Sequence, residues 1–548
     1  MERHRKAVSQ IAAAVRSFFD RREPYRIAHG STNSTRPARS SGTRVVDISA
    51  LRNVLSVDAA RRTALVEPNV PMDALVSATL RHGLVPPVVM EFPGITAGGG
   101  FAGTAGESSS FKHGFFDDTV RSVEMVLADG EVVEVGNPRF AEGAAAAQGQ
   151  QPQPQRGDLF RGAAGAVGTL GVTTLLELEL MQARRWVRTT YRRTRSVAEA
   201  VAAVREEAGR AENDYVDGIL FGEDHGVVIT GRLTDDKPDG VRPQTFSGAW
   251  DPWFYMHVRE RTRDATPSPA STSSPSRDQH QNQHPTDYIP LAEYLFRYDR
   301  GGFWVGEGAF RYFRFVPFSR AARWFLDDFL HTRMLYRALH GSGESARFVV
   351  QDLALPFATA ERLVDYTARE LGIWPLWLCP LRRRAPPTFH PHTTTPAWAK
   401  QQQQQQQEGA AGEGEGEGEE DEMMLNIGVW GWGPADRAEF VAKNRALEAK
   451  VRELGGMKWL YAHTYYGEDE FWDVYGGRGW YDALREKYRA ATLPSVYDKV
   501  KVDVADRREG RGLRGMWPVA GLYGIWKSIK SKDYMLHRKA EWKYKGEK

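Results

Sequence analysis

The stretch TAGGGFAGTAGESSSFKHG, residues 96–114, carries the strongest chemical signal in this protein of 548 residues. Its six glycines, with serines and threonines around them, leave backbone N–H groups that no side chain shields. Such a segment can approach a phosphate or a flat ring closely and donate several hydrogen bonds to it. It is not a Walker loop, because no Gly-Lys-Ser/Thr follows the glycines, and it is not a Rossmann fingerprint, because no hydrophobic strand leads into it. We interpret it as a cofactor-binding loop, with a purely structural glycine loop as the alternative.

Two further stretches of small residues share this character. Residues 29–36, HGSTNSTR, form a short loop ahead of the first expected strand and have the composition of a pyrophosphate cradle. In residues 158–172, DLFRGAAGAVGTLGV, small residues recur directly before a strand with a buried, apolar pattern. Three such loops in the first third of the sequence favour a bound cofactor over a merely flexible glycine run.

Strand and helix patterns alternate around the loops and predict two α+β units. The first unit covers roughly residues 25–183, and its Asp129-Gly130 between two alternating runs is a hairpin signal. Its expected strands are 45–48, 54–57, 63–67, 123–128, 131–135 and 172–180, and its expected helices are 71–82 and 160–167. The second unit covers 184–500, with helices expected at 197–211, 321–339 and 358–371 and strands at 215–221, 227–230, 425–429 and 458–461.

The composition excludes several classes of protein. Hydrophobic residues make up 41% of the sequence, so a large core is available. Cys379 is the only cysteine, which excludes a disulfide framework and any multi-thiolate metal site, and we expect no metal. The net charge of +3 gives no argument for nucleic-acid binding. No stretch reaches the roughly 18 uncharged apolar residues of a membrane-spanning helix.

Both ends of the sequence, and three inserted loops, have distinct compositions. Residues 1–24 contain an amphipathic helix, expected at 8–19 and read as packed on the domain. Stretches 141–156, 263–285 and 401–422 are low in complexity and are expected to be loops without a core. Residues 501–548 form a basic tail with interleaved Trp and Tyr, in which twelve Lys/Arg face four acids from residue 507 onward. A solvated tail and a contact with lipid headgroups are both compatible with that composition.

The three loops, separated by short strands, resemble the FAD-binding domain of the vanillyl-alcohol oxidase/p-cresol methylhydroxylase superfamily. Within it, Glu91-Phe92-Pro93-Gly94-Ile95-Thr96 and Glu107-Ser108-Ser109-Ser110 look most like the delta(24)-sterol reductases of the diminuto/dwarf type. This narrower resemblance recurs at 124–130, 374–380, 470–472, 484–488 and 496–500, and so covers about residues 25–500 outside the insertions. The sequence lacks the hydrophobic N-terminal anchor of the animal members and adds the basic tail.

The resemblance implies a two-part FAD-binding domain followed by a second α+β domain that caps it and binds substrate. FAD is expected to be non-covalent. Some superfamily members attach it through a histidine, and His113 lies near such a position, but ordinary packing of His113 is favoured. The expected cofactor-binding residues are His29, Gly30, Ser31, Thr32, Asn33, Thr96, Ala97, Gly98, Gly99, Gly100, Phe101, Ala102, Gly103, Thr104, Ala105, Gly106, Glu107, Ser108, Ser110, His113, Gly114, Gly165, Gly168, Gly171 and Val172.

The reaction implied by the resemblance is reduction of a carbon–carbon double bond in the side chain of a sterol. Hydride from NADPH would pass through flavin N5, and a protein acid would supply a proton. No spacing rule selects that acid among the candidates Tyr461, His463, Tyr465, Tyr466 and Glu307. Ring-rich segments of the second domain could line an apolar slot; they contain Phe303, Trp304, Phe310, Tyr312, Phe313, Trp374, Trp377, Trp430 and Trp432.

Two other functions remain compatible with the sequence. One keeps the flavin but makes the protein an oxidase or dehydrogenase of an alcohol, sugar or other small molecule. The other is a non-catalytic, membrane-associated scaffold whose glycine loop is structural. The expected location is the cytoplasm or the cytosolic face of the endoplasmic reticulum membrane.

Overall fold

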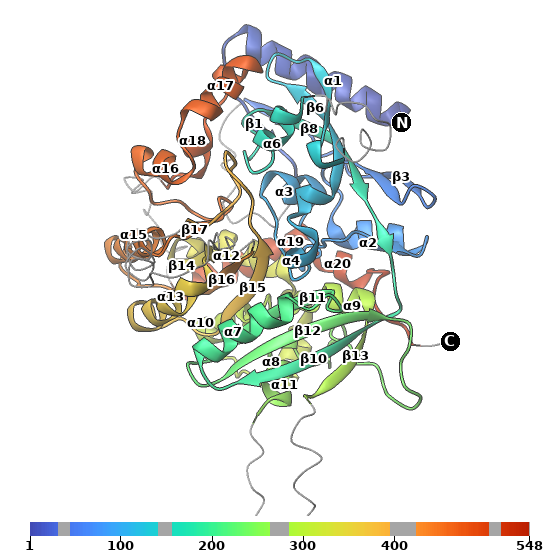
Figure 1. Cartoon of the computed structure of the whole chain (residues 1–548), viewed down its shortest axis with the longest axis vertical. Helices are drawn as coiled ribbons and strands as arrows, with labels where there is room; N and C mark the ends of the chain where they lie inside the picture. The colour runs from blue at the N-terminus through green and yellow to red at the C-terminus, as the bar shows by residue number, and fades with distance from the viewer. Residues whose placement is uncertain (31–43, 141–155, 264–283, 395–422, 503–516, 547–548) are drawn as a thin grey trace, which may run out of the picture.

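The computed structural model describes residues 1–30, 44–140, 156–263, 284–394, 423–502 and 517–546. These residues form two α+β units, each built on its own antiparallel sheet, and Figure 1 shows the first unit above the second. The predicted α+β class is therefore confirmed. The three stretches expected to be coreless loops lie almost entirely outside the described residues, as do Ser31, Thr32 and Asn33.

The first unit contains a five-stranded sheet in the order β3-β4-β8-β6-β7. Its strands are β3 (Val54–Asp58), β4 (Thr63–Val66), β6 (Val120–Leu127), β7 (Val132–Gly136) and β8 (Gly171–Glu179). Strands β6 and β7 form the predicted hairpin, with Gly130 at a φ of +86° in its turn. Two small pairs accompany the sheet: β1 (Arg26–Ala28) lies parallel to β2 (Val45–Asp47), and β5 (Leu84–Val85) pairs with β9 (Met181–Gln182).

One long helix, α1, and several short ones surround this sheet. The amphipathic pattern of α1 (Glu2–Asp20) buries one face against β2 and β6, and that face consists of His4, Val8, Ile11, Val15 and Phe18. At its start His4 bonds to Glu67 at 2.9 Å and to Glu124 at 3.2 Å. The other helices of the unit are α2 (Met72–Leu80), α3 (Ala97–Ala102), α4 (Ser110–His113), η1 (Phe116–Thr119) and α6 (Gly157–Ala163).

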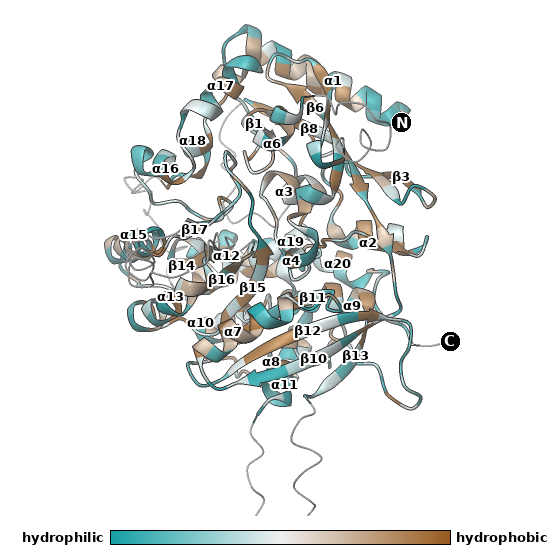
Figure 2. Ribbon diagram, viewed as in Figure 1, coloured by the Kyte–Doolittle hydropathy of each residue, from teal (hydrophilic) through white to brown (hydrophobic). Residues whose placement is uncertain are grey.

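The second unit contains an eight-stranded antiparallel sheet in the order β13-β10-β12-β11-β15-β16-β14-β17. Its strands are β10 (Trp186–Thr194), β11 (Tyr215–Leu220), β12 (Gly226–Thr234), β13 (Thr286–Pro290), β14 (Phe348–Leu355), β15 (Leu376–Arg382), β16 (Met423–Trp432) and β17 (Met457–Lys458). Strands β12 and β15 of the larger sheet carry brown, apolar segments in Figure 2, whereas β10 is largely teal and white.

The two faces of this larger sheet pack against different partners. Alternation along β15 sends Leu376 and Leu378 into a core that also contains residues of α7 (Val197–Ala208), α13 (Phe357–Glu370) and α15 (Arg437–Glu453). Trp377 and Cys379 point to the other face and join the core that includes the first unit. The glycine-rich segment is therefore packed against the opposite face of the sheet from these three helices.

The remaining helices connect and cover the two units. They are α8 (Phe254–Arg261), α9 (Leu291–Leu295), α10 (Val305–Phe313), α11 (Arg320–Phe325), η2 (Asp327–Phe329), α12 (Thr332–Ser342), η3 (Glu344–Arg347), α16 (Glu468–Val474), α17 (Gly479–Lys487), η4 (Ala490–Thr492), α18 (Val496–Val500), α19 (Val519–Ser531) and α20 (Tyr534–Arg538). No helix within the described ranges is both long and apolar enough to cross a bilayer.

The single helix expected at 321–339 is wrong, because this segment breaks into α11, η2 and α12. The buried Asp299 carboxylate explains the new start: it accepts from the backbone N–H of Thr332 at 3.1 Å and from its hydroxyl at 2.5 Å. Such capping satisfies N–H groups that a continuous helix would have paired internally.

Candidate functional site

Two of the small-residue loops predicted to act together meet in space, and the strand that leads into the third reaches them. Gly165 donates its backbone N–H to Phe101 O at 3.3 Å, and Val167 donates to Ala102 O at the same distance. A Cβ on Gly168 would lie 2.8 Å from Ile27 Cδ1, on the strand that leads to Gly30. Three segments that are far apart in the sequence, 27–30, 96–106 and 165–171, thus form one surface.

A fourth segment, which the sequence analysis did not assign to the cofactor, also reaches this surface. Lys499 on α18 donates to Val167 O at 2.9 Å and to Gly168 O at 3.4 Å. Burial, together with the Lys499 charge, lowers the pKa of His29. The ammonium group therefore stands beside the predicted pyrophosphate loop, where a cation favours a bound anion.

Several of the predicted glycines are required by packing, whatever else they do. A Cβ on Gly98 would lie 2.7 Å from Pro68, one on Gly100 would lie 2.5 Å from Met90 Cε, and one on Gly171 would lie 2.7 Å from Val126 O. These contacts explain the glycines without a ligand. Ala102, Gly103, Ala105 and Gly106 stay partly accessible between the buried residues Phe101, Thr104 and Ser108. Packing limits side chains here too, because a Cβ on Gly103 would lie 2.9 Å from Gly99 O and one on Gly106 would lie 2.6 Å from Leu381 Cδ2.

A buried cluster of charges lies where the first unit meets the large sheet. Arg297 Nη2 is 2.7 Å from Glu91 Oε1 and 3.0 Å from Asp217 Oδ2, and all three side chains are almost completely buried. Asp217 Oδ2 also accepts from Tyr298 at 2.7 Å and from Trp377 at 3.1 Å. Glu91 Oε2, Asp217 Oδ1 and Arg297 Nε have no hydrogen-bond partner among the described residues. Buried polar atoms of this kind are uncommon and point to a functional region.

Three acids in this region have raised pKa values. Burial raises the pKa of Glu91 to about 7, although the Arg297 guanidinium opposes the shift. Burial, with the charges of Glu91 and Asp352, raises the pKa of Glu107 well above its ordinary value. Burial raises the pKa of Asp352 to about 6 against the hydrogen bonds that it accepts. The site therefore has carboxyl groups that can carry a proton near neutral pH.

One predicted proton donor, Tyr461, belongs to this region. Its hydroxyl donates to Asp352 Oδ2, and Asn426 donates to Asp352 Oδ1 at 3.1 Å. Tyr461 and Glu107 lie deep in the protein yet keep part of their surface accessible, and the same is true of Tyr336 on α12. Burial, with the charge of Asp352, raises the pKa of all three, so they lie together around this carboxylate, next to the loop 102–107.

The other candidate donors lie in different surroundings. Glu307 accepts from Tyr255 at 2.7 Å and from Arg311 at 2.7 Å. Tyr465 packs in the core that contains residues of α13 and α15, and burial raises its pKa to about 12. His463 is only half-buried, and its carbonyl accepts from Lys458. Tyr466 is buried without a partner for its hydroxyl among the described residues.

The aromatic residues expected to line a slot divide into separate groups. Phe303 contacts Trp377 at 5.5 Å and Trp430 at 4.5 Å between ring centroids, and Phe92 of the first unit contacts Phe303 at 5.6 Å. Trp304 belongs to the same group, at 5.6 Å from Trp430. Trp374 packs on the opposite side of the sheet, in the second core. Phe310 instead contacts Trp253 and Phe318, and Tyr312 stacks on Trp432.

His113 is placed on α4, beside an ion pair. Its neighbour Lys112 binds Asp214 at 2.7 Å. Burial and the Lys112 charge lower the pKa of His113 to about 4, so the imidazole is neutral at pH 7. A surface cleft of about 1110 Å³, walled in part by Asp158, Arg384 and Trp480, contains none of the residues of the Glu91–Arg297 cluster.

Comparisons with known proteins agree with this site. Residues 6–136 match the FAD binding domain family. The delta(24)-sterol reductase of Homo sapiens is 26% identical over 460 residues, which cover 82% of this chain and 76% of that protein. The chain is a relative of the delta(24)-sterol reductases. The enzyme of that name from Arabidopsis thaliana is 26% identical over 485 residues, covering 85% of this chain and 78% of that protein.

A shorter match lies outside that group. The decaprenylphosphoryl-beta-D-ribose oxidase of Mycolicibacterium smegmatis is 35% identical over 95 residues, or 17% of this chain and 21% of that protein. Together these findings confirm the predicted resemblance and the class of FAD-dependent oxidoreductase.

Proposed function

We propose that the protein reduces a carbon–carbon double bond in the side chain of a sterol, with FAD bound non-covalently on the loops 27–36, 96–110 and 165–172. The residues present can accommodate the cofactor, because the partly accessible glycine-rich segment at Ala102 contacts the turn at Val167, where Lys499 supplies a cation. Bound FAD would supply the redox chemistry, passing hydride from NADPH through N5 to the alkene. The name of the relatives, delta(24)-sterol reductase, supports the reduction of a sterol, and the proposed reaction needs an acid in a dry site.

The observation that carries the proposal is the Tyr461–Asp352 pair, in which the tyrosine hydroxyl donates to a carboxylate near Glu107 of the glycine-rich segment. The alkene also requires a proton, and in our proposal the Tyr461 hydroxyl provides it while Asp352 orients the hydroxyl and restores its proton. An Asp352 pKa near 6 suits a group that gains and loses a proton near neutral pH. Arg297, Glu91 and Asp217 hold the two units together around the pair.

Substrate binding in this proposal uses the ring group next to the site. Phe92, Phe303 and Trp430 provide an apolar wall that the aliphatic tail of a sterol would contact. The substrate is apolar and membrane-resident, so we place the enzyme at the cytosolic face of the endoplasmic reticulum membrane.

The deciding experiment is anaerobic incubation of FAD-loaded protein with NADPH and a panel of sterols unsaturated in the side chain, with products read by mass. A gain of two hydrogens on one sterol is the expected result. Tyr461→Phe should retain bleaching of the flavin by NADPH and lose about 10²–10⁴-fold in product formation. Tyr465→Phe, in the other core, is the matched control and should keep both activities. If NADPH leaves the flavin oxidised while an alcohol bleaches it, the protein is an oxidase or dehydrogenase instead.

A further inference from the structure

Helix α19, in the C-terminal segment, packs on the second unit through small residues. Ala520, Gly521, Gly524 and Ser528 form its buried face, which lies against α12. A Cβ on Gly521 would lie 2.6 Å from the Tyr312 ring, and a Cβ on Gly524 would collide with Ala338 O. Ser528 donates to Met334 O at 3.2 Å. The described part of the basic tail is therefore not a free, solvated segment, because α19 packs closely on the second unit.

The outer face of the same helix is apolar and exposed to solvent. Val519, Leu522, Trp526 and Ile529 recur at intervals of three and four residues, so they form one stripe. Leu522 is 51% exposed and Trp526 52% exposed. We call these four residues, with Trp517 and Phe315, the docking face. Trp517, 53% exposed, donates to Tyr312 O at 2.8 Å, and Phe315 contacts Phe313, which lies beside Gly521.

Basic residues border the docking face. Residues 517–546 contain seven Lys/Arg and only two acids, Asp533 and Glu541. Both acids are paired with cations of the main body, Arg337 and Arg81. Lys527 lies 4.9 Å from the ring of Tyr523, which is half-buried, and Lys530 lies 5.5 Å from the ring of the exposed Trp526. Exposed Trp and aliphatic side chains with lysines at their edge are typical of a helix lying in a lipid headgroup region.

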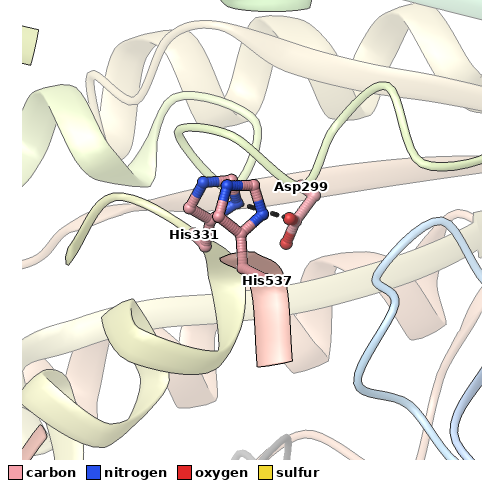
Figure 3. A group of neighbouring side chains, drawn as sticks. All are labelled: Asp299, His331 and His537. Carbon is pink, nitrogen blue, oxygen red and sulfur yellow. Dashed lines mark hydrogen bonds and ion pairs between the residues drawn. The ribbon is translucent and has the colours of Figure 1, made fainter. Parts of the chain in front are cut away.

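The segment after α19 is held firmly to the second unit. Figure 3 shows His537 of α20 beside Asp299 and His331, with its ring centroid 3.2 Å from that of His331. His331 Nδ1 lies 2.6 Å from Asp299 Oδ2, and Lys543 Nζ lies 2.8 Å from His537 Nε2. Asp299, His331 and His537 could offer atoms to a metal ion. Because Lys543 and Thr332 already donate to His537 and Asp299, we interpret the group as a hydrogen-bonded clamp.

Two more contacts complete the attachment. Trp542 packs on Phe296 at 4.9 Å, and Tyr544 donates its backbone N–H to Glu293 at 3.0 Å. The docking face is thus presented on a fixed support. A helix of 13 residues is about 20 Å long, too short to span a bilayer of roughly 30 Å.

We propose that the docking face binds the surface of an anionic bilayer, with α19 lying in the headgroup layer. The inference rests on the proposed function in one respect, because a sterol substrate resides in a membrane. Helix α12, on which α19 packs, also carries Tyr336, which interacts with Asp352. Since packed helices lie about 8–10 Å apart, docking would bring the site within one helix layer of the lipid.

Sedimentation of the full-length, FAD-loaded protein with vesicles tests the proposal. Vesicles are made of phosphatidylcholine alone or of phosphatidylcholine with phosphatidylserine. Wild type should bind the mixed vesicles, and L522S/W526S/I529S should lose at least about tenfold in binding. K527E/K530E should lose about tenfold on mixed vesicles and change little on neutral ones. The control V45S/V132S changes exposed apolar residues on the first unit and should bind like wild type.

Two results would overturn the proposal. One is equal binding of wild type and the triple variant. The other is concentration-dependent dimerisation that the triple variant abolishes, without vesicle binding, because the docking face would then join two copies. Turnover of a detergent-dispersed sterol separates this inference from the proposed function. The triple variant should keep that turnover, because the sterol no longer has to come from a membrane. If the proposed function is wrong, wild type itself shows no turnover but still binds vesicles.

Discussion

Replacing Arg297 by methionine tests whether the buried charge cluster holds the two units together. Methionine keeps much of the aliphatic stem of Arg297. It removes the guanidinium, which lies 4.2 Å from the Tyr294 ring centroid, 2.7 Å from Glu91 and 3.0 Å from Asp217. Two carboxylates then stay buried without that counter-charge. Breaking such a pair typically costs about 3–5 kcal/mol in the free energy of unfolding.

The loss should depend on pH, with a definite sign. The Glu91 pKa of about 7 is raised above its ordinary value, so the folded state binds more protons than the unfolded state between roughly pH 4.5 and 7. Stability from this group is therefore present at low pH and is lost as the pH rises through 7. Without Arg297 the pKa rises further, so R297M should be closer to wild type at pH 5.5 than at pH 8.

Urea unfolding followed by tryptophan fluorescence at both pH values measures the effect. E91Q/R297M should recover part of the loss at pH 8, because one of the two stranded charges is gone. A deficit below about 1 kcal/mol, or one that is equal at pH 5.5 and pH 8, would refute the reasoning.

Four further outcomes follow from the same contacts. D352N should remove the ionisation near pH 6 from the pH profile of product formation, because the Asp352 pKa is raised to about 6; an unchanged profile would assign that ionisation elsewhere. G100A should destabilise by about 1–3 kcal/mol, since its Cβ would lie 2.5 Å from Met90 Cε, whereas G467A has open space and should be nearly neutral in thermal unfolding. K499M should weaken FAD binding about tenfold in equilibrium dialysis and reduce its salt dependence, and K501M, which removes an exposed partner of Asp498, should not. Acid precipitation should release the flavin from wild type, whereas a yellow pellet would show covalent attachment.

Local patterns were sufficient for the first unit. The Asp129-Gly130 turn, the amphipathic face of α1 and the small-residue loops all predicted features that the structure contains, because each depends on residues close in sequence. The broken helix at 321–339 was not predicted because its cause is tertiary. Asp299, more than 30 residues earlier, supplies the cap at Thr332.

The charge cluster escaped the sequence analysis for a related reason. Glu91, Asp217 and Arg297 come from three segments separated by 80 residues or more, and no spacing rule connects them. One signal was nevertheless present: Asp217 stands inside the strand YVDGIL, whose six residues are all buried. An acid at the centre of an apolar strand requires a buried partner, and that requirement predicts an Arg or Lys from elsewhere in the sequence. Lys499 lies in the 496–500 motif, which the sequence analysis did identify. Its contact with Val167 was not predicted, because it forms only when α18 packs against the first unit.

The same cluster also argues that the boundary between the units has more than a structural role. A boundary built for stability alone would satisfy its polar atoms or replace them by apolar ones, because buried ion pairs give little net stability. Here Glu91, Asp217 and Arg297 each keep one unpartnered atom among the described residues, and the neighbouring acids Glu107 and Asp352 have raised pKa values. The two units together place proton-carrying groups beside a partly accessible glycine-rich segment, which neither unit provides alone. That combination suits a redox reaction that also moves a proton, and it explains why the protein keeps costly charges at this boundary.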